Sequence, residues 1–217
     1  EKKVVFYLSN NDQRMECLLK VMEAFVKFNL DQEYTIKVIF GAKLDKNLIP
    51  KVFQKYIEHP SDAEAQEDLA TAKYLLSGES LPKYFVRKEG QNVIRFFDEF
   101  HKEENNRLEL AQNKLSWLIN STFVFTEDAK SAEYLSDNPY FMELQGKVEQ
   151  FSENIIRSKE EIIDHILNRK IEDVKSDKEH ILIFVSAWKD EELEERYLRL
   201  ITDNMNYDQK DVILVMK

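Results

Sequence analysis

Glycine and cysteine are scarce in this chain, and their scarcity excludes several kinds of protein. The 217 residues include four glycines, none in the Gly-x-Gly-x-x-Gly or Gly-x-x-x-x-Gly-Lys spacing of dinucleotide and P-loop sites. A single cysteine, Cys17, excludes an internal disulfide. No stretch reaches the ~18 consecutive apolar residues of a membrane span. A reducing, aqueous compartment is therefore expected.

Positive charge is in the minority, since 31 Lys and Arg stand against 41 Asp and Glu and give a formal net charge of −10. Binding to a phosphate backbone needs a basic surface, so nucleic acid is not an expected partner. The histidines are scattered and lack a Cys or His neighbour at zinc-ligand spacing. No metal site and no bound cofactor are predicted.

The hydrophobic pattern predicts an α/β fold. Residues 4–8 form a short apolar run, typical of a strand covered on both faces. Apolar residues at helical spacing follow over residues 15–26, with Asn11 or Asp12 as the N-cap, and residues 34–40 read as the next strand. Strand, helix and strand in this order form a parallel βαβ unit. We therefore expect a Rossmann-like parallel sheet flanked by helices.

The middle of the chain is less regular. Capping boxes begin at Ser61 and Ser158, and each predicts a helix start. Residues 84–86 and 93–97 flank a polar turn at Gly90, so they form either a hairpin or two successive strand edges.

A polar, charged stretch over residues 173–179 is the best candidate linker. After it, residues 181–185, a helix opening at Asp190 and residues 212–216 repeat the strand, helix, strand order. We therefore predict a Rossmann-like N-terminal domain over residues 1–175. Residues 176–217 are predicted to be a linker and the opening βαβ unit of a second, truncated Rossmann-like domain, within a longer protein.

The loop formed by Ser9, Asn10 and Asn11 lies between the first predicted strand and helix. Backbone N–H groups at such a place bind an anion or a sugar hydroxyl. Plain helix capping explains the same residues, so both interpretations stay open.

Three stretches, residues 72–94, 111–127 and 183–190, resemble the CDP-glycerol glycerophosphotransferase family, the TagB/TagF-type enzymes of bacterial teichoic acid synthesis. The first contains Pro-Lys-Tyr-Phe and a turn ending in Gly-Gln, and the last contains Ala-Trp-Lys-Asp. The resemblance implies two Rossmann-like domains facing across a cleft, the GT-B arrangement. It places Trp188, Lys189 and Asp190 at the entry to the second domain, facing the ligand.

The sequence departs from the family at its proposed catalytic base. Where the family has His-Gly, this chain has Asp98 and Glu99, and His101 lies three residues late. A carboxylate takes a proton in catalysis when its pKa is raised toward the operating pH. Either Asp98 is a substitute base or the domain has lost the chemistry.

The resemblance implies a transferase of teichoic acid or wall-polymer synthesis, moving a group from CDP-glycerol or a nucleotide sugar to a polyol-phosphate or glycan acceptor. In such enzymes the second domain holds most of the donor, so these residues alone are expected to be inactive without the remainder of the parent chain. The alternative is a catalytically degenerate module that binds a partner or acts as a scaffold. The expected location is the cytoplasm, at the inner face of the membrane, with any peripheral anchor in other regions.

Overall fold

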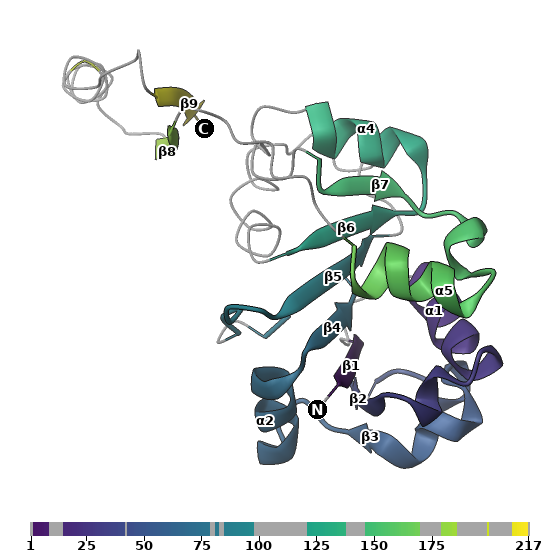
Figure 1. The fold of residues 1–217 in the computed structure, drawn as a ribbon. Helices are drawn as coiled ribbons and strands as arrows, with labels where there is room; N and C mark the ends of the chain where they lie inside the picture. Colours follow the sequence, from purple (N-terminus) through teal and green to yellow (C-terminus); the bar gives the residue numbers. More distant parts are fainter. Residues whose placement is uncertain are drawn as a thin grey trace.

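The computed structural model describes residues 2–8, 15–41, 43–78, 81–82, 85–97, 121–137, 146–169, 179–185, 199 and 210–216. Within these ranges, seven parallel strands form one sheet in the order β3-β2-β1-β4-β5-β6-β7 (Figure 1). The strands are β1 (Lys3–Leu8), β2 (Thr35–Phe40), β3 (Ile57–Glu58), β4 (Tyr74–Ser77), β5 (Asn92–Phe97), β6 (Phe123–Thr126) and β7 (Val148–Gln150).

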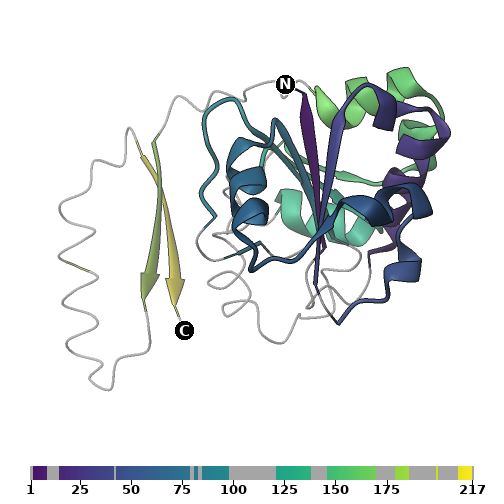
Figure 2. The same cartoon turned by 90° about the horizontal axis from the view of Figure 1, so that it is seen from below.

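Helices cover both faces of this sheet. Seen from below in Figure 2, α2 lies on one face, and α1 and α5 lie on the other. The helical elements are α1 (Glu16–Lys27), α2 (Ala63–Thr71), α4 (Ala129–Asp137), α5 (Lys159–Ile162) with a π-helical turn over Ile163–Leu167, and short 3₁₀ helices at Leu30–Gln32, Lys46–Leu48, Lys51–Tyr56 and Glu153–Ile156. A Rossmann-like α/β fold, predicted from the alternation of strands and helices, is confirmed.

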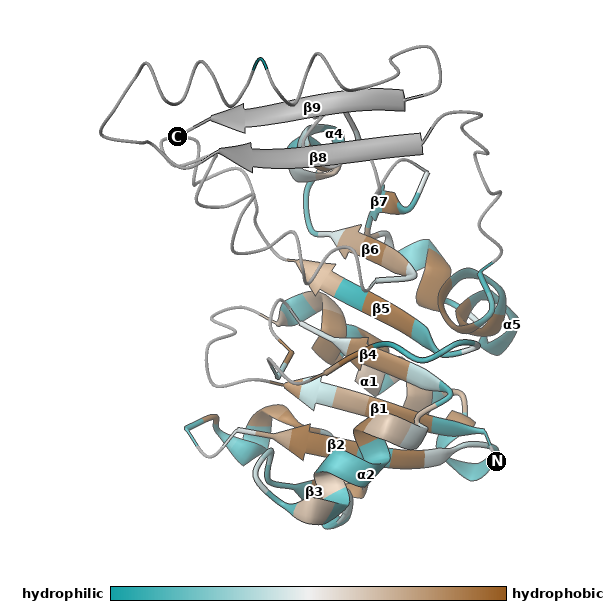
Figure 3. Ribbon diagram, turned by 90° about the vertical axis from the view of Figure 1, so that its left-hand side faces the viewer, coloured by the Kyte–Doolittle hydropathy of each residue, from teal (hydrophilic) through white to brown (hydrophobic). Residues whose placement is uncertain are grey.

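The central strands are mostly apolar and appear largely brown in Figure 3. Their side chains pack in two cores, one on each face of the sheet. On the face covered by α1 and α5, one core contains Phe6 of β1, whose ring meets that of Phe25 of α1 edge to face, with centroids 5.2 Å apart, and stacks with that of Phe53, with centroids 5.9 Å apart. On the α2 face, Val5 and Leu75 pack with Leu69 of α2. Strands covered on both sides are continuously apolar, which explains why their runs are visible in the sequence.

Three helix starts were predicted. That of α2 is confirmed to within one residue: its N-cap is Asp62, and the Ser61 hydroxyl lies 2.7 Å from Nδ1 of His59. The α1 helix begins at Glu16 after Met15, so neither Asn11 nor Asp12 is its N-cap. The third start is confirmed, since Oγ of Ser158 accepts a hydrogen bond from the Glu161 N–H at 3.1 Å.

Residues 93–97 belong to β5, which pairs parallel with β4. A hairpin between residues 84–86 and 93–97 is therefore wrong, because a hairpin requires antiparallel strands. Val86 lies outside any strand and is 73% exposed.

A second sheet contains β8 (Glu179–Val185) and β9 (Lys210–Met216). The two strands are parallel and in register from Glu179 opposite Lys210 to Val185 opposite Met216. Both predicted strands at this end are confirmed. The boundary near residue 175 stays a prediction, because residues 170–178 lie outside the described ranges. Among the described helices, none is long and apolar enough to cross a membrane.

Candidate functional site

The strand order changes direction between β1 and β4. From β1 the chain adds β2 and β3 on one side, then returns to add β4, β5, β6 and β7 on the other. In open parallel sheets, ligands bind outside the carboxyl ends of the strands at such a switch point. Here those ends are Leu8 of β1 and Ser77 of β4, which are followed by residues 9–14 and by Gly78.

Three polar side chains lie in one row across the strands at this switch point. Tyr7 of β1 pairs in register with Ser77 of β4, and Ser77 pairs with Arg95 of β5. Tyr7 is 6% exposed, and Ser77 and Arg95 are 0% exposed. We call these three residues the polar row.

The polar row interrupts an apolar face. Two residues earlier on the same strands, Val5, Leu75 and Val93 form a register row that is completely buried in the core under α2. Because side chains alternate between faces, the polar row lies on this same α2 face, closer to the carboxyl edge. A buried arginine is costly without compensating contacts, so the polar row is a distinct feature of this face.

Sequence reasoning missed the polar row. The available signal was Arg95 itself, a charged residue in the otherwise apolar run of residues 93–97. Its neighbour across the sheet, Ser77, gave no signal, because only the strand register brings positions 18 residues apart together.

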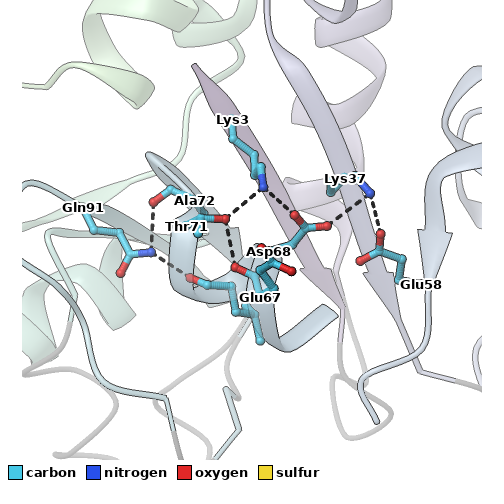
Figure 4. Close-up of polar contacts among 9 residues, drawn as sticks. Lys3, Lys37, Glu58, Glu67, Asp68, Thr71, Ala72 and Gln91 are labelled. Carbon is cyan, nitrogen blue, oxygen red and sulfur yellow. Dashed lines mark hydrogen bonds and ion pairs between the residues drawn. The ribbon is translucent and has the colours of Figure 1, made fainter. Parts of the chain in front are cut away.

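On the same face, where α2 meets β1, β2 and β3, lies a group of ion pairs, shown in Figure 4. Nζ of Lys3 lies 2.5 Å from Oδ1 of Asp68, and Nζ of Lys37 lies 3.2 Å from Oδ2 of Asp68. Lys37 also lies 2.6 Å from Oε1 of Glu58. We call these four residues the ion-pair cluster. It ties α2, through Asp68, to β1, β2 and β3.

Burial and the lysines shift the pKa values of the two carboxyls in opposite directions. Burial raises the pKa of Glu58, although the hydrogen bond from Lys37 opposes this; its Oε2 is buried and accepts no hydrogen bond from the described residues. Burial also acts to raise the pKa of Asp68, but hydrogen bonds from Lys3 and Lys37 outweigh it and hold that pKa below its usual range. In the cluster, two lysines pair with two carboxylates, which is typical of a structural contact.

Gln91, one of the residues that carry the family resemblance, has a structural role here. Its Nε2 donates hydrogen bonds to the carbonyl oxygens of Leu69 at 2.9 Å and Ala72 at 3.0 Å. These carbonyls lie at the C-terminal end of α2, where a helix leaves acceptors without intrahelical donors. Gln91 therefore caps α2 from the turn before β5 (Figure 4).

All residues predicted to act at the site lie outside the described ranges. Ser9, Asn10 and Asn11 follow Leu8, the last residue of β1, and Asp98 follows Phe97, the last residue of β5. Trp188, Lys189 and Asp190 come shortly after β8. The structure thus shows where the preceding strands end, and the roles of the predicted site residues stay predictions.

The remaining candidates for chemistry are ordinary structural residues. Cys17 is buried on α1, as expected for a small apolar side chain. His165 is half exposed, and its Nε2 lies 2.8 Å from Oε2 of Glu161. Among the described residues, no group of three or more His, Cys, Asp or Glu side chains is placed to hold a metal ion.

Comparisons with known proteins give a likeness in structure. No protein-family model and no curated protein match the sequence. Two solved structures of variants of the wall teichoic acid polymerase TagF each match 100% of this chain, with 16% identity and a TM-score of 0.50. A structure of S. aureus MnaA with UDP matches with 14% identity and a TM-score of 0.39, covering 100% of this chain and 63% of that one. The chain thus shares its fold with the TagF structures, of whose length it covers 57%.

Proposed function

We propose that this chain is the acceptor-side part of a transferase that builds a bacterial wall polymer. The likeness in fold to TagF, a wall teichoic acid polymerase, over the whole chain carries the proposal. The donor is CDP-glycerol or a nucleotide sugar, and the acceptor is a hydroxyl of a polyol phosphate or glycan. Because the chain covers 57% of each TagF chain, the complete reaction is proposed for a two-domain GT-B arrangement and not for these residues alone.

In the glycerophosphate version, the acceptor hydroxyl attacks the phosphorus that carries glycerol. A new phosphodiester bond forms, the phosphoanhydride bond breaks and CMP leaves. Asp98 is the proposed base that takes the hydroxyl proton. It directly follows β5, at the carboxyl edge where open parallel sheets bind ligands. Phe97 before it is 1% exposed, and an apolar neighbour of this kind favours a raised carboxyl pKa.

The other proposed site residues belong to two loops. Ser9, Asn10 and Asn11 follow β1 at the switch point, where backbone N–H groups receive an anion or a sugar hydroxyl. Trp188, Lys189 and Asp190 follow β8, the first strand of the second sheet, and face the donor in the proposed arrangement. No metal is assigned a part in the proposed reaction.

A second function, a catalytically degenerate module that binds a partner or positions a polymer, has one specific observation in its favour. Asp98 and Glu99 stand where the resembling family has His-Gly. In this version a neighbouring domain performs the transfer, and the carboxyl edge binds without reacting.

A transfer assay separates the transferase from the degenerate module. It measures how much radiolabelled glycerophosphate the protein, in its full natural length, moves from CDP-glycerol to a polyol-phosphate acceptor. We expect Asp98→Ala to lower kcat by about 100-fold or more, the usual contribution of a general base. Glu89→Ala, which removes an exposed carboxylate from the turn before β5, is the matched control and should leave turnover unchanged. Unchanged turnover in Asp98→Ala removes Asp98 as the base. Donor binding without turnover in the unaltered protein supports the degenerate module.

The proposed location is the inner face of the cytoplasmic membrane. With a net charge of −10, this chain brings no overall basic attraction to anionic lipid. The proposed peripheral contact with the membrane is therefore assigned to other regions of the protein. Fractionation of cells that express the natural protein checks this assignment. A protein that is recovered in the membrane pellet and is released from it by high salt supports a peripheral contact.

A further inference from the structure

A basic surface lies on the segment that connects β2 to β3. Residues 43–56 contain four lysines and one aspartate, a local charge of +3 in a chain whose formal net charge is −10. Lys46, Lys51 and Lys55 are exposed, and we call these three residues the lysine surface. We infer that the lysine surface binds the anionic chain of a polyol-phosphate polymer next to the carboxyl edge of the sheet.

The two 3₁₀ helices that carry the lysine surface are anchored in the core. Ile49 and Phe53 are buried, and the ring of Phe53 stacks with that of Phe6 in β1. Nε2 of Gln54 donates hydrogen bonds to the carbonyl oxygens of Lys46 and Ile49, each at 3.1 Å, and so joins the two helices. The backbone beneath the lysines is therefore fixed before a ligand arrives, which lowers the ordering cost of binding.

The lysine surface has no acidic partner in the part of the chain that the structure describes. Its ammonium groups form no ion pair there, whereas both lysines of the ion-pair cluster meet carboxylates. The aspartate of this segment, Asp45, accepts a hydrogen bond from the Asn47 N–H at 2.9 Å and caps a 3₁₀ helix. Three neighbouring positive charges are thus available to an external anion.

The lysine surface begins beside the switch point. The N–H of Gly41, directly after β2, donates to the carbonyl oxygen of Leu8, the last residue of β1, at 3.0 Å. The Leu44 N–H then donates to the Gly41 carbonyl oxygen at 3.0 Å, so the chain turns at the carboxyl edge two residues before Lys46. Open parallel sheets bind ligands at this edge. A polymer on the lysine surface therefore lies next to the proposed site.

The spacing of the lysines favours a ligand with repeated phosphates. A 3₁₀ helix rises by about 2 Å per residue, so the Cα atoms of Lys51 and Lys55 are separated by about 8 Å along the helix. A chain with one phosphate in each repeat meets several such charges at once, and each further contact adds to its affinity. Lysine is a point charge on a flexible stem and needs no fixed phosphate orientation.

An anionic membrane is a less suitable partner for this surface. Helices that bind in the membrane interface present a continuous apolar face below their basic residues. Between residues 43 and 56, the large apolar side chains that are exposed are Leu48, at 48%, and Tyr56, at 38%. The Lys55 ammonium lies over the Tyr56 ring, 4.7 Å from its centroid. Leu48 alone does not form an apolar face, so the charges favour a polymer in water.

This inference rests on the proposed function only for the identity of the polymer, which is the acceptor of the proposed reaction. Binding of a phosphate polymer to the lysine surface does not itself require a transfer step. Binding and transfer are therefore measured separately.

The first test is fluorescence anisotropy of labelled poly(glycerol phosphate) with the protein in its full natural length. We expect the polymer to bind, and the triple variant Lys46→Gln, Lys51→Gln and Lys55→Gln to weaken the affinity by about tenfold, the combined effect of three exposed charge contacts. Cations that neutralise phosphates release bound counterions, so the affinity should fall as salt rises, and less steeply in the variant. Absence of binding, or the same affinity and salt dependence in both proteins, overturns the inference.

The matched control removes three exposed lysines from other parts of the chain. It combines Lys27→Gln on α1, Lys88→Gln in the turn before β5 and Lys130→Gln on α4, and it changes the net charge equally. We expect its affinity for the polymer to equal that of the unaltered protein. An equal loss in both triple variants overturns the inference, because the effect is then one of overall charge.

A second binding measurement separates the polymer from a membrane. Vesicles that contain phosphatidylglycerol are the probe, and sedimentation measures the bound fraction. Equal vesicle binding by the unaltered protein and the lysine-surface variant, with weaker polymer binding by the variant, supports the inference. Loss of vesicle binding with unchanged polymer affinity assigns the surface to a membrane and overturns it.

The transfer assay distinguishes this inference from the proposed function. We expect the lysine-surface variant to raise the KM for a long polymer acceptor more than the KM for a single-unit acceptor. Polymer binding through the lysine surface with no glycerophosphate transfer supports the inference and rejects the proposed function. Transfer with the same KM for the long acceptor in the variant rejects the inference and keeps the proposed function.

Discussion

Two parts of the α2 face use charge in different ways. Where α2 meets β1, β2 and β3, two lysines meet two carboxylates in the ion-pair cluster. At the carboxyl ends of β4 and β5, Ser77 and Arg95 lie opposite each other and are completely buried. The cluster ties α2 to the sheet, whereas the carboxyl edge is the place of the proposed binding site.

The amino edge is closed by contacts from distant parts of the chain. The hydroxyl of Tyr74 lies 2.8 Å from Oδ1 of Asn168, and Nδ2 of Asn92 donates to the Leu167 carbonyl oxygen at 2.9 Å. Arg169 pairs with Glu149 and stacks over the ring of Phe123, 4.0 Å from its centroid. Changes at this edge should therefore reduce stability.

The largest expected effect comes from Asp68→Ala. The substitution leaves Lys3 and Lys37 partly buried without their shared carboxylate, and breaking a buried ion pair in this way costs about 3 kcal/mol. Urea unfolding measures the loss. Glu153→Ala removes the exposed partner of Lys20 and should not change the urea midpoint measurably. Equal midpoints for both variants would remove the distinction between the ion-pair cluster and an ordinary surface pair.

Next in size is Gln91→Leu, which removes the side-chain cap of α2. Two carbonyl oxygens lose their donor in a buried place, and the free energy of unfolding should fall by about 2 kcal/mol. The control is Gln150→Leu, because Gln150 makes a single, exposed hydrogen bond to the Glu127 carbonyl oxygen at 3.2 Å. Equal urea midpoints in Gln91→Leu and Gln150→Leu would contradict the role of Gln91 as a cap of α2.

A smaller effect is expected for Tyr74→Phe. The substitution keeps the ring and removes the hydroxyl that bonds to Asn168, which should cost about 1 kcal/mol. Tyr56→Phe is its control, since Tyr56 is an exposed tyrosine at the end of a 3₁₀ helix. The difference between the two midpoints in urea measures how firmly residues 167–169 are held on the amino edge. No difference would show that this contact adds nothing to stability.

The smallest effect is expected in the pH dependence of the ion-pair cluster, because its two carboxyls oppose each other. The pKa of Asp68 is lowered in the folded state, so its contribution is present above about pH 4 and is lost as pH falls toward the folded pKa. The pKa of Glu58 is raised, so its contribution falls as pH rises above about 4.3. Urea midpoints measured from pH 2 to pH 7 should therefore lose less on acidification in Asp68→Asn, and less on alkalinisation in Glu58→Gln, than in the unaltered chain. Parallel profiles in all three proteins contradict this assignment.

Much of the fold could be predicted from the sequence because parallel strands buried on both faces are continuously apolar. β1, β2, β6, β8 and β9 were visible as such runs. The short edge strands β3 and β7 were not, since two or three residues leave no pattern. The N-cap of α2 was misplaced by one residue because Ser61 and Asp62 are both residue types that favour this position.

The site was harder to predict than the fold. Asn10 was singled out from its position after an apolar run, which needs no tertiary information, and Asp98 from its place in the family resemblance. The polar row depends on strand order and register, which no local pattern encodes. Gln91 was noticed only for its place in a family-like stretch, and its cap on α2 depends on a helix that ends 20 residues earlier.

The central claim is that the carboxyl edge at the β1/β4 switch point is the binding site. Its most direct test is hydrogen–deuterium exchange of the natural protein with and without CDP-glycerol. The account predicts slower exchange with the donor in peptides that cover the ends of β1, β4 and β5, and no change in peptides that contain Asp68 or Asn168. Protection confined to the amino edge, or no protection in the presence of bound donor at any strand end, would contradict it.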